Sequence, residues 1–158
     1  MFFKKKKIRQ VDFNDTKKVS TKPFSYPAKI ILAWAKAIEG NTDLLKYLND
    51  NGFEELVMAA HAIRLKDDAR KWLMENGYPH VMAMINAAEG NEQALKWLKI
   101  NDYTMFYNIA KAIEHDHDGL IWLKRNATPD IYILTKSIQQ VKDEIEEAHN
   151  DIHKRSKE

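Results

Sequence analysis

The chain has 158 residues, contains no cysteine and carries a formal net charge of +2. Without cysteine, the fold cannot use disulfides, thiolate zinc sites or a cysteine nucleophile, which suits a reducing compartment. The longest apolar run, from Ile30 to Ala35, is far shorter than the roughly 20 residues that a membrane-spanning helix needs.

Residues 1–25 are predicted to form a basic, poorly ordered leader, because they lack helical periodicity and are rich in Lys, Ser and Thr. Residues 1–29 carry a charge of +7, whereas the remaining 129 residues carry −5. Such asymmetry suggests an interaction tail, and the basic side chains that could hold nucleic acid or an anionic membrane are Lys4, Lys5, Lys6, Lys7 and Arg9. No signal-peptide core follows these lysines, so we expect a cytoplasmic protein.

A 25-residue period organises the chain from about Pro27 to about Lys136. An aromatic residue followed by leucine recurs at Tyr47, Trp72, Trp97 and Trp122, and asparagine recurs at Asn51, Asn76, Asn101 and Asn126. Periods of 20 to 50 residues are typical of solenoids. We expect one repeat domain over 26–158, with units at about 28–52, 53–77, 78–102 and 103–127.

Each unit is predicted to hold two short helices. In the second unit, Phe53, Leu56, Val57 and Ala60 recur at the spacing of one buried helical stripe, and Ala69, Trp72 and Leu73 mark a second helix. Helices this short are not stable alone, so the units must stack. The expected fold class is all-α, an α-solenoid (α-α superhelix) of about four short helix-turn-helix repeats with a long C-terminal helix.

The long helix is predicted over about 129–155. Its apolar residues run from Ile131 to Ile152 in alternating steps of three and four, which is the spacing of a coiled-coil seam. Either the helix folds back as a cap on the repeats, or it pairs with a partner helix, including that of a second copy in a homodimer.

One segment resembles a known repeat family. The residues from Ala87 to Leu98 resemble the turn and second helix of an ankyrin repeat, and Pro79 resembles the proline that opens the first helix of that repeat. The period of 25 is shorter than the roughly 33 residues of ankyrin, so the projecting hairpin of that family is missing. The resemblance implies protein binding.

The sequence offers one candidate interaction surface beside the buried stripe of the first helices. Positions four residues apart share a helix face, so stacked units would align aromatic and polar side chains there. The candidate partner-binding residues are Met82, Asn86, Tyr107, Lys111, Tyr132 and Lys136, and Val57 and His61 take the same positions in the second unit. The alternative is a plain boundary between core and solvent.

Other patterns favour structural roles. The column Tyr47, Trp72, Trp97 and Trp122 is expected to pack between repeats rather than to bind a ligand. The run from Glu114 to Asp118 is expected to be a polar turn capped by Asp116, not a metal site, and Glu146 with His149 and His153 is expected to be a solvated helix face.

No phosphate loop or serine elbow is present. We therefore expect a non-enzymatic scaffold for an unidentified protein partner, with no cofactor, metal or small-molecule substrate; binding to nucleic acid or membrane through the leader is the alternative.

Overall fold

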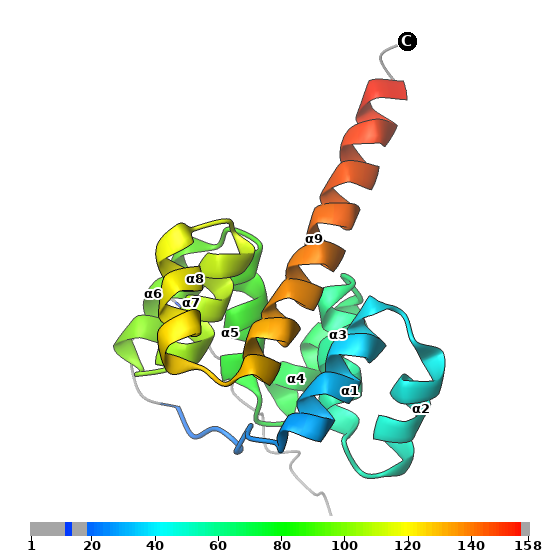
Figure 1. The fold of residues 1–158 in the computed structure, drawn as a ribbon, viewed down its shortest axis with the longest axis vertical. Coiled ribbons are helices and arrows are strands. Elements are labelled where there is room, and N and C mark those ends of the chain that lie inside the picture. Colours follow the sequence, from blue (N-terminus) through cyan, green and yellow to red (C-terminus); the bar gives the residue numbers. More distant parts are fainter. Residues whose placement is uncertain (1–11, 14–18, 156–158) are drawn as a thin grey trace, which may run out of the picture.

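The computed structural model describes residues 12–13 and 19–155, with side chains up to Ile152, and this part of the chain holds nine α-helices and no β-strand (Figure 1). The helices are α1 (Ala28–Glu39), α2 (Thr42–Asp50), α3 (Glu54–Ile63), α4 (Asp67–Glu75), α5 (Pro79–Ala88), α6 (Glu92–Ile100), α7 (Thr104–Ile113), α8 (His117–Asn126) and α9 (Pro129–Arg155). Consecutive helices pack in pairs, so the predicted all-α solenoid of four helix pairs and a long last helix is confirmed.

The repeated asparagine ends each second helix. The side-chain amides of Asn51, Asn76, Asn101 and Asn126 donate to the carbonyl oxygens four residues earlier, at 2.7, 2.8, 2.9 and 3.0 Å. The last carbonyls of a helix have no partner within the helix, so this bond satisfies one of them in every unit. The asparagine column is therefore a repeated C-terminal cap.

The array closes on itself. The first helices α1, α3, α5 and α7 pack side by side, and the first half of α9 lies against α7 at one end and, most extensively, against α1 at the other (Figure 1). Leu134, Ile138 and Val141 of α9 are at most 2% exposed as a result. We call the five helices α1, α3, α5, α7 and α9 the inner ring; α9 is thus a cap that joins both ends of the array.

The second half of α9 extends beyond the other helices (Figure 1). Along the predicted coiled-coil seam, Ile145 is partly buried, whereas Ala148 is exposed and Ile152 is 68% exposed. The inner ring therefore already covers most of the seam, and a partner helix would find only these last two apolar side chains.

Part of the expected leader is packed rather than poorly ordered. Residues 19–27, which we call the strap, are extended and cross the repeats. The amide of Lys22 donates to the carbonyl oxygen of Gly77 at 2.8 Å, and the Thr21 hydroxyl lies 2.7 Å from the Tyr103 hydroxyl. Phe24 packs edge-on against Trp34 and Phe106. Burial of this aromatic ring provides the order that the composition of the leader does not predict.

The tryptophan column packs between units, as predicted, at the two central positions. Trp72 stacks on Tyr78 with ring centroids 6.0 Å apart, and Trp97 stacks on Tyr103 at 5.6 Å; both pairs have an interplanar angle of 10°. Each pair joins the second helix of one unit to the start of the next. Tyr47, in the first unit, is 39% exposed.

Candidate interaction surface

Two of the predicted binding residues lie together on α7. The ammonium group of Lys111 lies 5.2 Å from the centre of the Tyr107 ring, one helical turn away, and that of Lys99, at the end of α6, lies 6.0 Å from the same ring. Ammonium groups at this distance are attracted to the π-face of an aromatic ring. The half-buried tyrosine is thus flanked by two positive charges.

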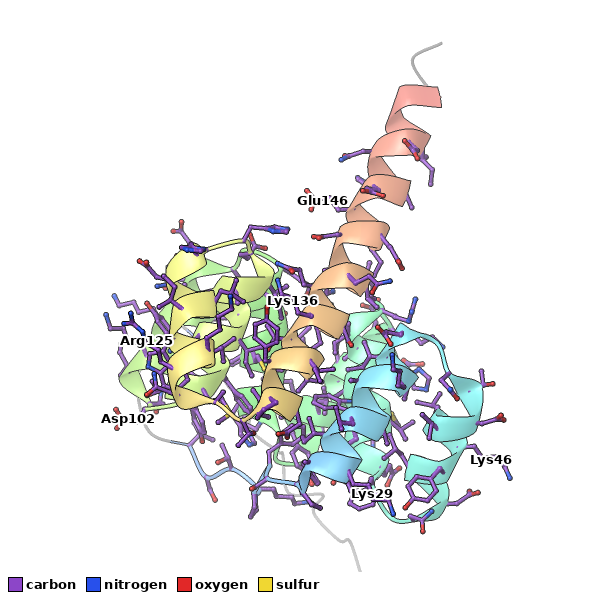
Figure 2. All side chains as sticks on the ribbon, viewed as in Figure 1. Lys29, Lys46, Asp102, Arg125, Lys136 and Glu146 are labelled. Carbon is purple, nitrogen blue, oxygen red and sulfur yellow. The ribbon has the colours of Figure 1, made fainter. Side chains whose placement is uncertain are left out.

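The same arrangement recurs one unit later. Lys136 of α9 and Lys124 of α8 lie 5.7 and 5.9 Å from the centre of the Tyr132 ring. Lys99, Tyr107 and Lys111 correspond to Lys124, Tyr132 and Lys136 at a spacing of 25 residues. We call these six residues the tyrosine–lysine surface; Figure 2 places Lys136 on the part of α9 that lies beside α7 and α8.

The charges of this surface are only partly neutralised by the chain. Lys111 pairs with Asp116 at 3.6 Å, and the Lys136 ammonium donates to the side-chain oxygen of Gln139 at 3.3 Å. Ion pairs this long on a partly exposed surface contribute little to stability. The two half-buried tyrosine rings and the four ammonium groups can therefore offer apolar contact and positive charge to a ligand that binds at the surface.

The predicted surface does not continue into the earlier units. Met82 is 3% exposed and Val57 is 9% exposed, so both contribute to the core. The Asn86 side chain accepts a hydrogen bond from Arg70 at 3.3 Å. His61 is half-buried, and burial, with the charge of Lys66 second, lowers its pKa. At these positions, buried apolar side chains replace the tyrosines, and His61 and the hydrogen-bonded Asn86 replace the lysines.

Lys99 and Lys124 were not predicted as binding residues, because the prediction considered the first helices, whereas these lysines lie near the ends of the second helices of the preceding units. Their recurrence at 25 residues was visible in the sequence. The residues Lys4 to Lys7 and Arg9 of the other predicted site lie outside the described part of the chain.

A second polar cluster lies where the inner-ring helices end. Glu89 accepts from Arg70 at 2.7 and 2.9 Å and from Lys142 at 2.8 Å, and Lys142 also donates to the carbonyl oxygen of Ile63 at 2.6 Å. Arg64 donates to the carbonyl oxygen of Ile38 at 3.1 and 2.8 Å. Cations at helix C-termini meet both unpaired carbonyls and the negative end of the helix dipole.

A cavity of about 430 Å³ lies beside this cluster, against α9. Burial, followed by the charge of Glu146, raises the pKa of Glu114, which lines it. His115 lies 3.0 Å from Asp143 on the same rim. Among the residues that the structure describes, no group of three histidines and carboxylates is arranged to hold a metal ion.

The predicted polar turn at Glu114 to Asp118 is confirmed in one respect, since the Asp116 side chain accepts from the amide of Asp118 at 3.0 Å and caps α8. The side chain of His153, which the sequence pairs with His149, lies outside the described side chains.

The fold and this surface have to be interpreted on their own. Comparisons of the chain with protein-family models, with curated proteins and with solved structures find no match. Within the described residues, none of the helices is both long and apolar enough to cross a membrane.

Proposed function

We propose that the protein is a non-enzymatic interaction scaffold, acting in the cytoplasm, that binds an acidic segment of a partner protein across the tyrosine–lysine surface. The observation that carries the proposal is the repetition of a tyrosine between two lysines on consecutive units, around Tyr107 and Tyr132. A protein-binding role is also what the resemblance to ankyrin repeats implies.

The spacing of the two tyrosines supports an extended ligand. They lie on α7 and α9, which pack against each other, and neighbouring helices are about 8 to 10 Å apart. A peptide in the polyproline II conformation has three residues per turn and advances about 3.1 Å per residue, so carboxylates three residues apart lie on one face about 9 Å apart. Each carboxylate would then face one pair of lysines, and the tyrosine rings would cover the peptide between them.

The charge distribution favours a short acidic peptide over a nucleic acid. Residues 30–158 carry a net charge of −5, so positive charge is confined to patches on an acidic body. A long polyanion would have to cross this acidic surface, whereas a short peptide would contact the tyrosine–lysine surface alone.

A fluorescent peptide with glutamates three residues apart tests the proposal by anisotropy. We expect Lys111→Gln with Lys136→Gln to weaken binding at least tenfold, and the affinity of the unchanged protein to fall as salt rises. The matched control, Lys46→Gln with Lys71→Gln, removes two exposed lysines from α2 and α4 and should bind normally. Equal loss in both variants, or no binding by the unchanged protein, would contradict the proposal.

The second candidate is binding of an anionic surface by the basic arm, favoured by the +7 charge of residues 1–29. Removal of residues 1–18 should then abolish binding to single-stranded DNA or to vesicles containing phosphatidylserine, while peptide binding persists. Retention of DNA or vesicle binding by the shortened chain would exclude the arm.

A further inference from the structure

A cavity of about 220 Å³ lies where the inner-ring helices begin, on the opposite side of the ring from the charged cluster. Its walls come from four of the five inner-ring helices and from the strap. The wall residues that matter most are Ile31 and Trp34 of α1, Met84 of α5, Ile109 of α7 and Leu134 of α9, with Phe24 of the strap across them. The ring closure therefore creates a space that no single unit contains.

The deep walls are apolar and almost fully buried, whereas the rim carries the polar side chains of Ser25, Tyr26, Thr128 and Asp130. Trp34 is 0% exposed, and Ile31, Met84, Ile109 and Leu134 are at most 4% exposed. The indole nitrogen of Trp34, which belongs to the deep walls, already donates to the carbonyl oxygen of Leu56 at 2.8 Å. The five deep side chains therefore offer no free hydrogen-bond donor, and the groups that could bind ordered water lie on the rim.

The deep part of this space, lined by buried side chains, departs from the usual packing of a protein interior. Protein interiors are packed about as densely as organic crystals, and their voids are seldom larger than a water molecule. An engineered apolar cavity of about 150 Å³ in another protein stays dry and binds benzene. The atoms that line an empty apolar cavity lack dispersion contacts on one side, and an apolar guest would restore them.

Phe24 covers one side of the cavity. Its ring lies edge-on to Trp34 at 5.5 Å, to Phe106 at 5.8 Å and to Tyr26 at 5.0 Å. The strap that carries it is held to the repeats by the backbone hydrogen bond from Lys22 to Gly77, by the hydroxyl contact between Thr21 and Tyr103, and by the Tyr26 hydroxyl, which donates to Glu55 at 2.6 Å. The Phe24 side chain packs through ring contacts, so rotation of this ring can admit a small molecule while the polar contacts of the strap stay in place.

We propose that this cavity binds a small, uncharged, predominantly apolar molecule of one or two aromatic rings, which enters beneath Phe24. Aromatic and methionine side chains in the wall suit flat rings, because methionine adapts to irregular shapes and sulfur packs well on aromatic edges. The carboxylate of Asp130 lies on the rim, where it repels anionic ligands such as fatty acids. This site is separate from the tyrosine–lysine surface.

Benzene and indole are suitable probes, and octanoate is the charged comparison. We expect indole to shift the methyl NMR signals of Met84 and Met105 saturably, with nuclear Overhauser contacts to Ile31 and Ile109, and octanoate to have no effect. Leu134→Phe should fill the cavity and weaken indole binding at least tenfold. The matched control is Ile133→Phe on the neighbouring position of α9, which is 44% exposed and should bind indole normally.

The Overhauser contacts are measured on the unchanged protein, so the proposal stays testable if Leu134→Phe does not fold. Absence of saturable shifts with both benzene and indole would overturn it. Contacts from indole to residues outside the cavity, equal binding of octanoate, or full indole binding by folded Leu134→Phe would also do so.

Discussion

The two ends of the inner ring differ in chemistry, although the same helices form both. At the end where the helices begin, the residues before α3, α5 and α7 are Phe53, Tyr78 and Tyr103, and none of them caps its helix through a side chain. At the other end, Arg64, Arg70, Lys142 and Gln139 donate to the last carbonyl oxygens of the inner helices.

The direction of the helices explains much of this difference. Parallel helices gather their negative dipole ends on one side, where cationic donors are stabilised. Carboxylates such as Glu89 then collect around those cations. The opposite side lacks this concentration of acceptors, so aromatic rings and an apolar cavity can occupy it. The two ends should consequently respond differently to protons and to substitution.

The largest effect is expected at the apolar end, on acidification. His80 is 3% exposed, its ring nitrogens make no hydrogen bond of normal geometry with the described residues, and burial, opposed only in part by the nearby backbone of Lys22, lowers its pKa to about 4. The unfolded chain binds this proton near pH 6.5, so stability is full above that pH and is lost as the pH falls toward 4. We expect a loss of about 3 kcal/mol by pH 4, measured by urea denaturation.

His80→Phe provides the control, because a phenyl ring suits the neighbouring Phe106 and Tyr103 and does not titrate. The variant should be at least as stable at pH 7 and should lose less stability between pH 7 and 4. Parallel pH curves for the two proteins would show that His80 is not buried as a neutral ring.

The next effect concerns the charged end. Lys142→Met removes the donor to Ile63 and one partner of Glu89, from a side chain that is 10% exposed. Leaving a carbonyl and part of a carboxylate unpaired should reduce the free energy of unfolding by about 1 to 3 kcal/mol. The matched substitution Lys71→Met breaks an exposed pair with Glu75 at 3.7 Å and should cost under about 0.5 kcal/mol. Similar losses in the two variants would mean that the cluster at this end adds little.

The smallest predicted effect on stability changes with pH in the direction opposite to that of His80. Burial and the charge of Glu146 raise the pKa of Glu114, so folding favours the protonated carboxyl group of this residue. The folded protein therefore loses stability as the pH rises through that pKa. Glu114→Gln keeps the shape and removes the charge. We expect a small increase in melting temperature at pH 7, equivalent to less than about 0.5 kcal/mol, that fades toward pH 4. A lower melting temperature of Glu114→Gln at pH 7 would contradict the repulsion between Glu114 and Glu146.

Most of the fold could be predicted because the determinants are local and repeated. The period of 25 residues places both helices of each unit, and the asparagine column marks the end of each second helix. Closure of the ring could not be predicted, because it depends on small rotations between units that add up over the array. Docking of the strap depends on the rings of Phe24 and Tyr26, which pack on residues that come together only when the units stack.

The candidate surface could be predicted in part for the same reason. Register places Tyr107 beside Lys111, and Tyr132 beside Lys136, because residues four apart share a helix face. The burial of Met82 was not visible, since the edge of an apolar stripe does not show how closely the neighbouring helix approaches. Contacts that cross from one unit to the next, such as that of Lys99 with Tyr107, require the stacking geometry.

Contact between α1 and α9 fixes the number of units. An open array can gain or lose a repeat by duplication or deletion and still bury its internal faces. Here an added block of 25 residues would separate the two helices that complete the circle, and both would expose apolar side chains. This protein therefore cannot gain repeats by tandem duplication, as open arrays do, without a new arrangement of the inner ring.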